Sequence, residues 1–257
     1  DILHSSDQEM IWSQTCSFFA DLGFKHVLYG YSPDSHGAVL GSPENYLVLS
    51  TLKQDVIRQI VREGYFRMSG TFHWALSNAG IASWSLTPQQ VGMPDDFEIT
   101  PEVAAFFFQH GLINGCTIGF PQERTRGRAV MALIAPPTTS QEEVDVQLDA
   151  ARDLIFTVAA TAHRCLSSLP YHPPGRRLTQ RQREVLEWVA EGKTTADIAQ
   201  IMGITPPTVE KHLRLARETL GVETTPHALI KASFLNQVFV AAPADDGSLK
   251  PLPVWPI

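Results

Sequence analysis

The sequence predicts an α+β protein in which an N-terminal α/β/α sandwich, built on a central antiparallel sheet, is followed by a small all-α domain. Helical and strand patterns alternate up to residue 169, whereas helical patterns alone follow residue 178. The charge divides as well, because residues 1–174 carry ten Lys and Arg against eighteen Asp and Glu, and residues 175–240 carry nine against seven. We expect domains at 1–169 and 178–240, a Pro- and Gly-rich linker at 170–177 and a Pro-rich tail at 241–257.

The composition is that of a globular, core-forming protein. Hydrophobic residues make up 44% of the 257 residues and charged residues 18%, with a net charge of −7. These values exclude collagen-like, coiled-coil and disordered chains. The negative net charge argues against a protein that coats polyanions without discrimination. No apolar run reaches the roughly 20 residues that a membrane span requires. We therefore expect a soluble cytoplasmic protein with no membrane partner.

The three cysteines, Cys16, Cys116 and Cys165, are far apart in the sequence and form no CxxC motif. We expect neither a disulfide framework nor a metal site, and we interpret the three as small buried residues. His163 lies two residues from Cys165, but two candidate ligands do not make a metal site.

Hydrophobic spacing predicts the first elements of the N-terminal domain. Ser6 can cap a helix that ends at Gly23. Residues 24–31 and 46–50 are typical of strands, and a helix over residues 51–63 follows. The apolar residues expected to face inward are Met10, Ile11, Cys16, Phe18, Phe19 and Leu22 in the first helix, and Leu52, Val56, Ile57, Ile60 and Val61 in the second.

The remaining elements complete the sandwich. A helix is expected from Thr100, with Pro101 at its first position, to Gly111. Residues 112–120 and 128–135 are typical of two strands joined in a hairpin-like pairing, which makes the sheet antiparallel. Ser140 and Glu143 then form a capping box that begins a long helix.

Three consecutive capped helices follow the linker. Two short helices joined by a Gly-containing turn of about four residues form a helix-turn-helix, whose second helix lies in the DNA major groove. The expected caps are Thr179 with Gln182, Thr194 with Asp197, and Thr205 before Pro206, and the expected stops are Gly192, Gly203 and Gly221.

The third of these helices, over residues 206–220, has two different faces. Arg214 can present a bidentate fork to guanine and Glu210 can accept from cytosine, while Lys211 and Arg217 suit phosphates. The alternative is an ordinary solvated face, but three capped helices with this turn favour DNA binding. The buried stripe is expected to be Val209, Leu213, Ala216 and Leu220. The expected DNA-contacting residues are Lys193, Thr194, Thr205, Thr208, Glu210, Lys211, His212, Arg214 and Arg217.

Residues 178–222, from LTQRQREVLEWVAEGK to LARETLGV, resemble the DNA-binding domain of LuxR-type transcription regulators. The resemblance implies a fourth helix at about residues 226–236, which completes a four-helix helix-turn-helix domain. In a homodimer this helix would pair with its twin through Ala228, Leu229, Ala232 and Leu235. The implied partners are double-stranded DNA carrying an inverted repeat, and RNA polymerase. Thr219 and Thr225 stand where basic residues are common in the family, so we expect fewer phosphate contacts.

The N-terminal domain resembles the autoinducer-binding domain of quorum-sensing LuxR proteins over about residues 10–165. The resemblance rests on Gly64-Tyr65-Phe66-Arg67, on Trp84 and on Gly111-Leu112-Ile113-Asn114-Gly115. It implies that a small signal molecule, an acyl-homoserine lactone or an analogue, binds between the sheet and the helices. Tyr, Trp, Asp and Ser or Thr side chains would hold its polar head, and an apolar tunnel would hold its acyl chain.

Most of the polar anchors of that family are replaced in this sequence. Ser69 stands at the usual Asp, Val56 at the usual Trp and Leu133 near the usual Ser or Thr. The candidate ligand-binding residues are Val56, Ile60, Ser69, Thr71, Trp84 and Leu133. Three alternatives follow: a different or more apolar ligand, a pocket filled by its own side chains, or an error in the register. A standard acyl-homoserine lactone-responsive activator is the further alternative.

An enzyme is the alternative from another functional class. Ser50-Thr51-Leu52-Lys53 matches the SxxK element of penicillin-binding enzymes, with Ser50 as nucleophile and Lys53 as its partner. No SDN or KTG element accompanies it, and average residue usage makes such a short match common. We therefore predict that the protein is not an enzyme.

Overall fold

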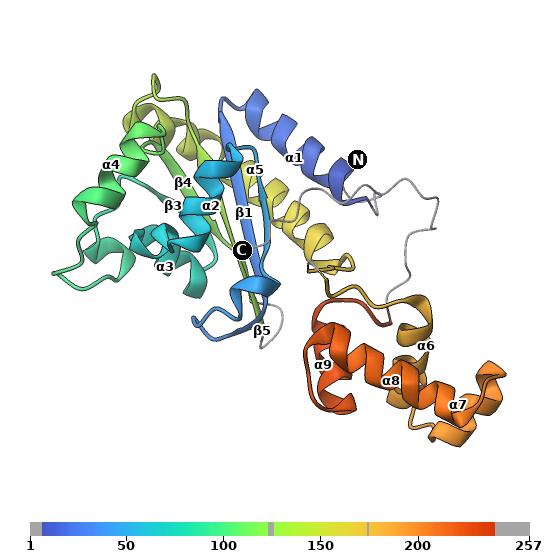
Figure 1. Cartoon of the computed structure of the whole chain (residues 1–257). Coiled ribbons are helices and arrows are strands. Elements are labelled where there is room, and N and C mark those ends of the chain that lie inside the picture. Colours follow the sequence, from blue (N-terminus) through green and yellow to red (C-terminus); the bar gives the residue numbers. More distant parts are fainter. Residues whose placement is uncertain (1–6, 123–125, 174, 240–257) are drawn as a thin grey trace. The chain divides into compact units, whose positions relative to one another are not determined.

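The computed structural model describes residues 7–122, 126–173 and 175–239. These residues form two compact units that divide between Ser167 and Ser168, the first of α+β type and the second helical (Figure 1). Tyr171, in the predicted linker, belongs to the second unit, where its N–H donates to the Leu235 carbonyl at 2.8 Å. The expected cap Ser6 and the expected tail at 241–257 lie outside the described residues.

The described part of the first unit contains a five-stranded sheet in the order β2-β1-β5-β4-β3, with every neighbouring pair antiparallel. The strands are β1 (His26–His36), β2 (Leu47–Ser50), β3 (Gly80–Ser83), β4 (Gly115–Gly119) and β5 (Arg126–Ile134). Ala132 of β5 lies opposite Thr117 of β4 and opposite Leu28 of β1. The predicted hairpin and the antiparallel sheet are therefore confirmed, whereas the patterns above do not indicate β3.

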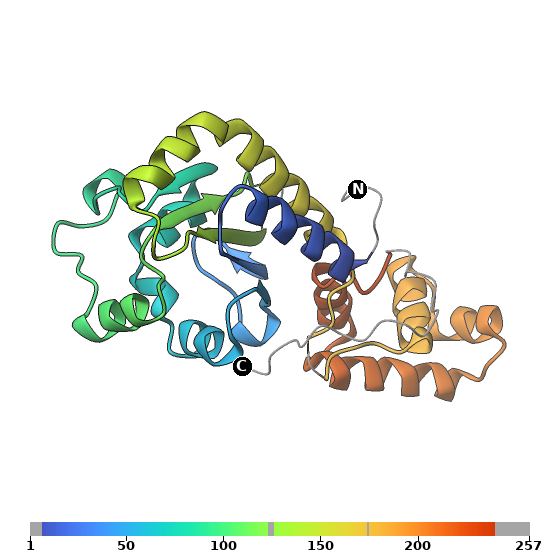
Figure 2. The ribbon, with the colours of Figure 1, turned by 90° about the horizontal axis from the view of Figure 1, so that it is seen from above.

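Helices cover both faces of this sheet, which confirms the predicted α/β/α sandwich (Figure 2). The helices on one face are α1 (Gln8–Asp21) and α5 (Gln141–Ser168), and those on the other are α2 (Gln54–Arg62), α3 (Gly70–Ser77) and α4 (Pro101–Gln109). Three 3-10 turns connect elements of this unit: η2 (Pro43–Asn45), η3 (Tyr65–Met68) and η4 (Gln89–Val91). The Ser140 and Glu143 capping box at the start of α5 is present, because each side chain accepts from the other residue's backbone N–H.

Two sequence expectations for the helices of this unit are wrong in detail. Met10 is 48% exposed, because the buried stripe of α1 passes through Ile11, Trp12, Thr15 and Phe19 instead. The second helix begins at Gln54 rather than at residue 51, because Thr51 follows directly after β2 and is still hydrogen-bonded to β1. The Thr51 N–H donates to the Val27 carbonyl at 3.0 Å, and its Oγ1 accepts from the Val27 N–H.

A buried cluster joins β1 to α5 on the face opposite α2, α3 and α4. The Tyr29 hydroxyl is hydrogen-bonded to Nδ1 of His163 at 2.8 Å, and the ring of Phe120 stacks on His163 at 4.4 Å. Burial lowers the pKa of His163 to about 4 and raises that of Tyr29. His163 is therefore held as a neutral imidazole at pH 7.

This burial predicts a loss of stability in acid. The unfolded imidazole keeps its ordinary pKa near 6.5, so the unfolded chain binds more protons between pH 6.5 and 4, and the stabilising contribution is lost as the pH falls through that window. We expect the free energy of unfolding to fall by roughly 2 kcal/mol between pH 7 and pH 5 because of this group. Urea unfolding of His163→Gln should show a smaller pH dependence than that of the unchanged chain. An undiminished pH dependence in His163→Gln would contradict the assignment.

Four helices form the described part of the second unit: α6 (Gln180–Ala190), α7 (Thr195–Met202), α8 (Pro206–Leu220) and α9 (Thr225–Phe234). The capping boxes of α6 and α7 are confirmed. Thr205 precedes α8, but its hydroxyl bonds to the Thr208 hydroxyl at 2.9 Å rather than to a backbone N–H. Gly203 has a φ of 65° in the turn between α7 and α8, a conformation that glycine adopts without strain. The predicted buried stripe of α8 is confirmed, since Val209, Leu213, Ala216 and Leu220 are all buried.

Candidate ligand cavity and DNA-binding surface

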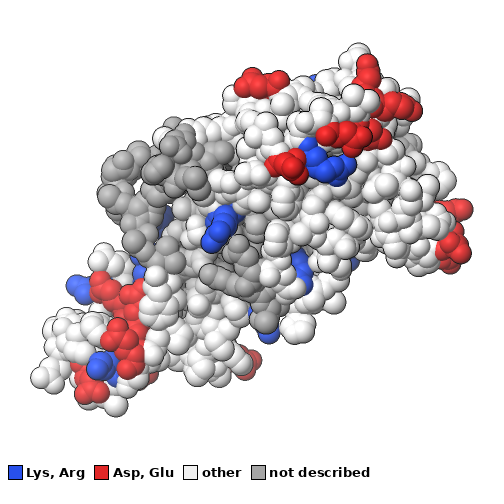
Figure 3. All heavy atoms as spheres, turned by 180° about the vertical axis from the view of Figure 1, so that it is seen from behind, with Lys and Arg blue, Asp and Glu red and all other residues white. Residues whose placement is uncertain are grey.

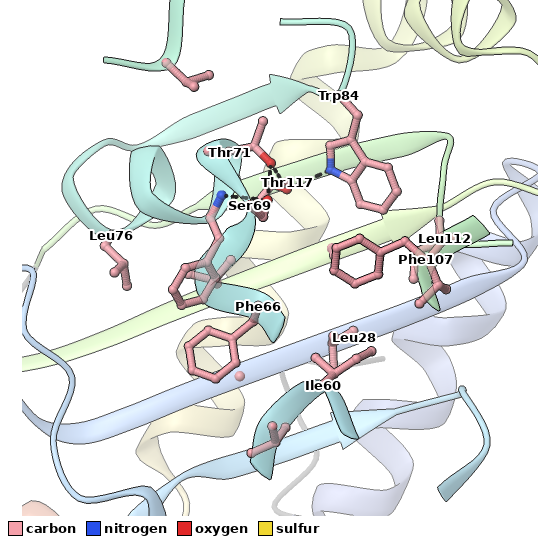
Figure 4. Close-up of a pocket in the computed structure, with 18 of the residues that line it drawn as sticks. Leu28, Ile60, Phe66, Ser69, Thr71, Leu76, Trp84, Phe107, Leu112 and Thr117 are labelled. Carbon is pink, nitrogen blue, oxygen red and sulfur yellow. Dashed lines mark hydrogen bonds between the residues drawn. The ribbon is translucent and has the colours of Figure 1, made fainter. Parts of the chain in front are cut away.

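A cavity of about 590 Å³ lies between the sheet and helices α2, α3 and α4 (Figure 4). One wall is formed by alternate residues of β5, which at about 3.4 Å per residue span about 20 Å from the first to the last. These residues are Arg128, Val130, Ala132 and Ile134. The cavity is therefore elongated along the strand rather than spherical.

Most of the lining is apolar and aromatic. Leu28, Ile60, Phe66, Phe107 and Leu112 project into the cavity from both the sheet and the helices (Figure 4). An apolar lining with a few convergent polar groups is typical of small-molecule sites, whose volumes run from about 300 to 1,000 Å³.

Four of the six candidate ligand residues line this cavity, namely Ile60, Ser69, Thr71 and Trp84. Leu133 is not among the lining residues, because successive residues of a strand point to opposite faces and its neighbours Ala132 and Ile134 are the ones that line the cavity. Val56 is not a lining residue either. Its side chain is 4% exposed and belongs to a core cluster with Ile57.

A chain of hydrogen bonds connects the polar groups of the cavity (Figure 4). Trp84 Nε1 donates to Thr117 Oγ1 at 2.8 Å, and Thr117 Oγ1 is 2.8 Å from Thr71 Oγ1. Thr71 Oγ1 is in turn 3.1 Å from Ser69 Oγ, which accepts from the Phe72 N–H at the start of α3. The indole N–H of Trp84 is therefore already used in the hydrogen bond to Thr117 and is not available to a ligand.

The proton count of this chain defines what it can offer to a ligand. Three hydroxyls carry three hydrogens, and the two hydroxyl-to-hydroxyl bonds use two of them. The indole and the Phe72 backbone supply their own hydrogens. One hydroxyl hydrogen is left over, so the network can donate one hydrogen bond to an acceptor such as a carbonyl oxygen.

Sequence reasoning missed five residues of the cavity that carry polar groups, namely Tyr31, Ser32, Tyr46, Thr117 and Arg128. Thr117 lies in a strand whose residues are all buried, and its role depends on a contact with Trp84 across 33 residues of sequence. Arg128 could have been found, because it shares the period-two face of Val130, Ala132 and Ile134 once that face is known to line the cavity.

The second unit presents most of the expected DNA-contacting residues at its surface. Lys193, Thr194, Thr205, Glu210, Lys211 and Arg214 are exposed, while Thr208, His212 and Arg217 are partly buried. Glu210 accepts from the Thr195 hydroxyl at 2.8 Å, and Arg217 donates to Thr225 Oγ1 at 3.0 Å. Figure 3 shows acidic and basic side chains interspersed on the face of this unit that it displays.

Arg214 forms an ion pair with Glu218 one helical turn later, at 2.6 Å. The two side chains are 55% and 56% exposed. An exposed pair of this kind is worth only about 0.3 to 0.5 kcal/mol, so a nucleic-acid base or phosphate could displace the glutamate at little cost.

Three of the four residues expected at the dimer seam on α9 are buried within their own unit, whereas Leu229 is partly exposed. Ala228 and Ala232 are fully buried and Leu235 is 1% exposed within the second unit, so these side chains are not available to a second copy. A helical apolar stripe does not reveal whether it packs on its own domain or on a partner. The outward side of α9 carries Ile230, which is 51% exposed.

None of the three cysteines forms a disulfide, and no group of three or more His, Cys, Asp or Glu side chains among the described residues could hold a metal ion. Within the same residues, no helix is long and apolar enough to cross a bilayer.

An α/β/α unit with an elongated apolar cavity, joined in one chain to a helix-turn-helix unit, is the arrangement of a transcription regulator with a separate sensory domain. Residues 7–166 match the model of the autoinducer binding domain, and residues 176–232 match that of the luxR family of bacterial regulatory proteins. The chain belongs to the LuxR family of quorum-sensing transcription regulators. It is therefore a regulator and not an enzyme. The Ser50 hydroxyl, the nucleophile considered for the SxxK element, instead accepts a hydrogen bond from the Leu52 N–H in the turn before α2.

The chain is also similar to individual proteins that are transcriptional activators. The transcriptional activator protein AnoR of Acinetobacter nosocomialis is 25% identical over 236 residues, which cover 90% of this chain and 92% of AnoR. The transcriptional activator protein BjaR1 of Bradyrhizobium diazoefficiens is 42% identical over 69 residues, or 27% of this chain and 28% of BjaR1. The crystal structure of Escherichia coli SdiA shares the fold, with a TM-score of 0.50 and 15% identity over 91% of this chain and 93% of SdiA.

Proposed function

We propose that this regulator binds an inverted DNA repeat as a homodimer, and that a small, largely apolar molecule in the cavity controls the binding. The molecule would differ from a standard acyl-homoserine lactone in its polar head, because the family's usual Asp anchor is replaced by Ser69. The observation that carries the proposal is the pairing of an elongated apolar cavity with a hydrogen-bonded chain from Trp84 to Ser69.

The size of the cavity favours a ligand over a pocket filled by its own side chains. About 590 Å³ lies within the usual range for small-molecule sites. An SdiA structure, with a TM-score of 0.51 and 15% identity to this chain, is a complex with octanoyl-rac-glycerol. That neutral acyl compound combines a chain for an apolar wall with oxygen acceptors for a hydroxyl, which is the combination we propose here.

The direct test is mass spectrometry of small molecules released from the purified protein, combined with thermal shifts against octanoyl-rac-glycerol and acyl-homoserine lactones of varied chain length. We expect a released acyl compound and a larger shift with octanoyl-rac-glycerol than with the lactones. A larger shift with a lactone would instead support the standard activator. No released molecule and no shift with any probe would contradict ligand control.

Thr117→Val should weaken the binding of octanoyl-rac-glycerol by roughly three- to tenfold. The substitution keeps the shape of the side chain but breaks the hydroxyl chain, and a neutral hydrogen bond is worth about 0.5 to 1.5 kcal/mol. Titration calorimetry measures the change. Thr161→Val makes the same chemical change on α5, away from the cavity-lining residues, and should leave the affinity unaltered. Equal affinities of the unchanged protein, Thr117→Val and Thr161→Val would show that the hydrogen-bonded hydroxyls do not contact the ligand.

The proposed homodimer needs a contact other than the buried side of α9. Any α9 pairing has to use the side that carries Ile230, which is exposed. Sedimentation of the unchanged chain and of Ile230→Glu tests this, and we expect a dimer that Ile230→Glu weakens. A monomer at micromolar concentration would refute the homodimer. Contact with RNA polymerase remains a prediction from the family resemblance.

A further inference from the structure

Arg128 is the one charged side chain among the described residues that line the cavity. All other polar lining side chains are neutral, and no Asp or Glu lines the cavity within the described part of the chain. An unpaired cation next to an apolar cavity is costly unless an anion or strong acceptors meet it. This residue therefore bears directly on the chemistry of the ligand.

Two backbone carbonyls hold the guanidinium of Arg128 in place. Nε donates to the Leu76 carbonyl at 3.0 Å, and Nη1 donates to the Gly127 carbonyl at 2.8 Å. Leu76 lies in the last turn of α3, where a cation is also favoured by the helix dipole. A guanidinium has five N–H donors, so three remain after these two bonds. No Asp or Glu in the described residues forms an ion pair with it.

The position of Arg128 separates it from the hydroxyl chain. Ala132 lies opposite Thr117, and Arg128 is four residues away along β5. At about 3.4 Å per residue the two sites are roughly 14 Å apart along the strand. The cavity lining also includes the apolar side chains of Val130, Phe66 and Phe72. A ligand that reaches both polar sites would therefore also contact apolar side chains.

We propose that the ligand is a medium- or long-chain carboxylic acid whose carboxylate pairs with Arg128 and whose chain runs along β5 toward Thr117. The inference rests on the proposed ligand function and specifies its chemical class. A carboxylate is the group that the planar fork of an arginine binds best, through two parallel N–H donors. A second oxygen function at the far end would accept the spare hydroxyl hydrogen near Thr117.

The test uses 10-hydroxydecanoate and its methyl ester, titrated calorimetrically into the full chain, Arg128→Met and Thr117→Val. In the unchanged chain we expect the acid to bind at least tenfold more tightly than the ester. Arg128→Met should weaken the acid by about ten- to a hundredfold, as expected for a charge-assisted hydrogen bond, and leave the ester nearly unchanged. Thr117→Val, at the other end, should keep the preference for the acid.

The outcomes separate this inference from the proposed function. An ester that binds the unchanged chain as tightly as the acid, or a preference for the acid that survives in Arg128→Met, would overturn the carboxylate assignment. If the ester or octanoyl-rac-glycerol binds and the acid does not, the proposed function stands and this inference fails. If no probe binds, both fail. Should Arg128→Met not fold, the comparison of acid and ester in the unchanged chain decides.

Discussion

Ala132→Trp is expected to abolish ligand binding, with a loss of about a hundredfold or more in affinity for octanoyl-rac-glycerol. Ala132 lies in the middle of the cavity wall, opposite both Leu28 and Thr117. An indole placed there occupies the space that an acyl chain would take. Because the cavity has room for the ring, the sandwich should remain folded, and its own thermal stability should stay level or rise.

The measurement is the amount of co-purifying small molecule by mass spectrometry, together with the thermal shift on adding octanoyl-rac-glycerol. Ala132→Val should give an intermediate affinity, since it fills less of the space. Ala150→Trp adds the same ring at an exposed position of α5 and should bind normally. Unimpaired binding by Ala132→Trp would place the ligand elsewhere.

Arg214→Ala is expected to cost about 1 to 3 kcal/mol of binding to the preferred DNA sequence, or roughly ten- to a hundredfold in Kd, and little on random DNA. Arg214 is exposed on α8 and is held only by its ion pair with Glu218. Its fork matches the two acceptors of guanine in the major groove. Specificity should therefore fall more than overall affinity does.

Lys211→Ala provides the contrast, because a phosphate contact carries no sequence information. It should weaken binding to all sequences alike and reduce the salt dependence by about one phosphate contact. Arg181→Ala is the matched control, since Arg181 is 58% exposed and also pairs with a glutamate, Glu184. Fluorescence anisotropy against specific and random duplexes measures all three. Equal losses on both duplexes for Arg214→Ala and Lys211→Ala would refute the assignment of roles.

The sequence predicted best those features that depend on neighbours along the chain. Both capping boxes in the second unit, the buried stripe of α8 and the turn at Gly203 follow from residues three or four positions apart. The hairpin of β4 and β5 and the sandwich class could also be predicted, because they follow from the order of the strand and helix patterns along the sequence. Ser69 and Trp84 were placed in the cavity by family resemblance, and both line it.

The features that sequence reasoning missed depend on contacts between distant segments. The family resemblance places Leu133 in the cavity, but a shift of one residue along a strand moves a side chain to the other face. Thr117 acquires its role only through Trp84 and Thr71. Ala228, Ala232 and Leu235 form an apolar stripe whose partner cannot be read from periodicity, and the stripe packs inside its own unit.

Binding of α8 to DNA underlies the role proposed for this protein, and it can be measured by selection from a pool of random duplexes with the purified full chain at moderate ionic strength. We predict enrichment of an inverted repeat by the unchanged protein and none by a chain carrying both Lys211→Ala and Arg214→Ala. If the unchanged protein enriches no sequence over the starting pool, with or without added cell extract, the chain does not recognise DNA in the manner described.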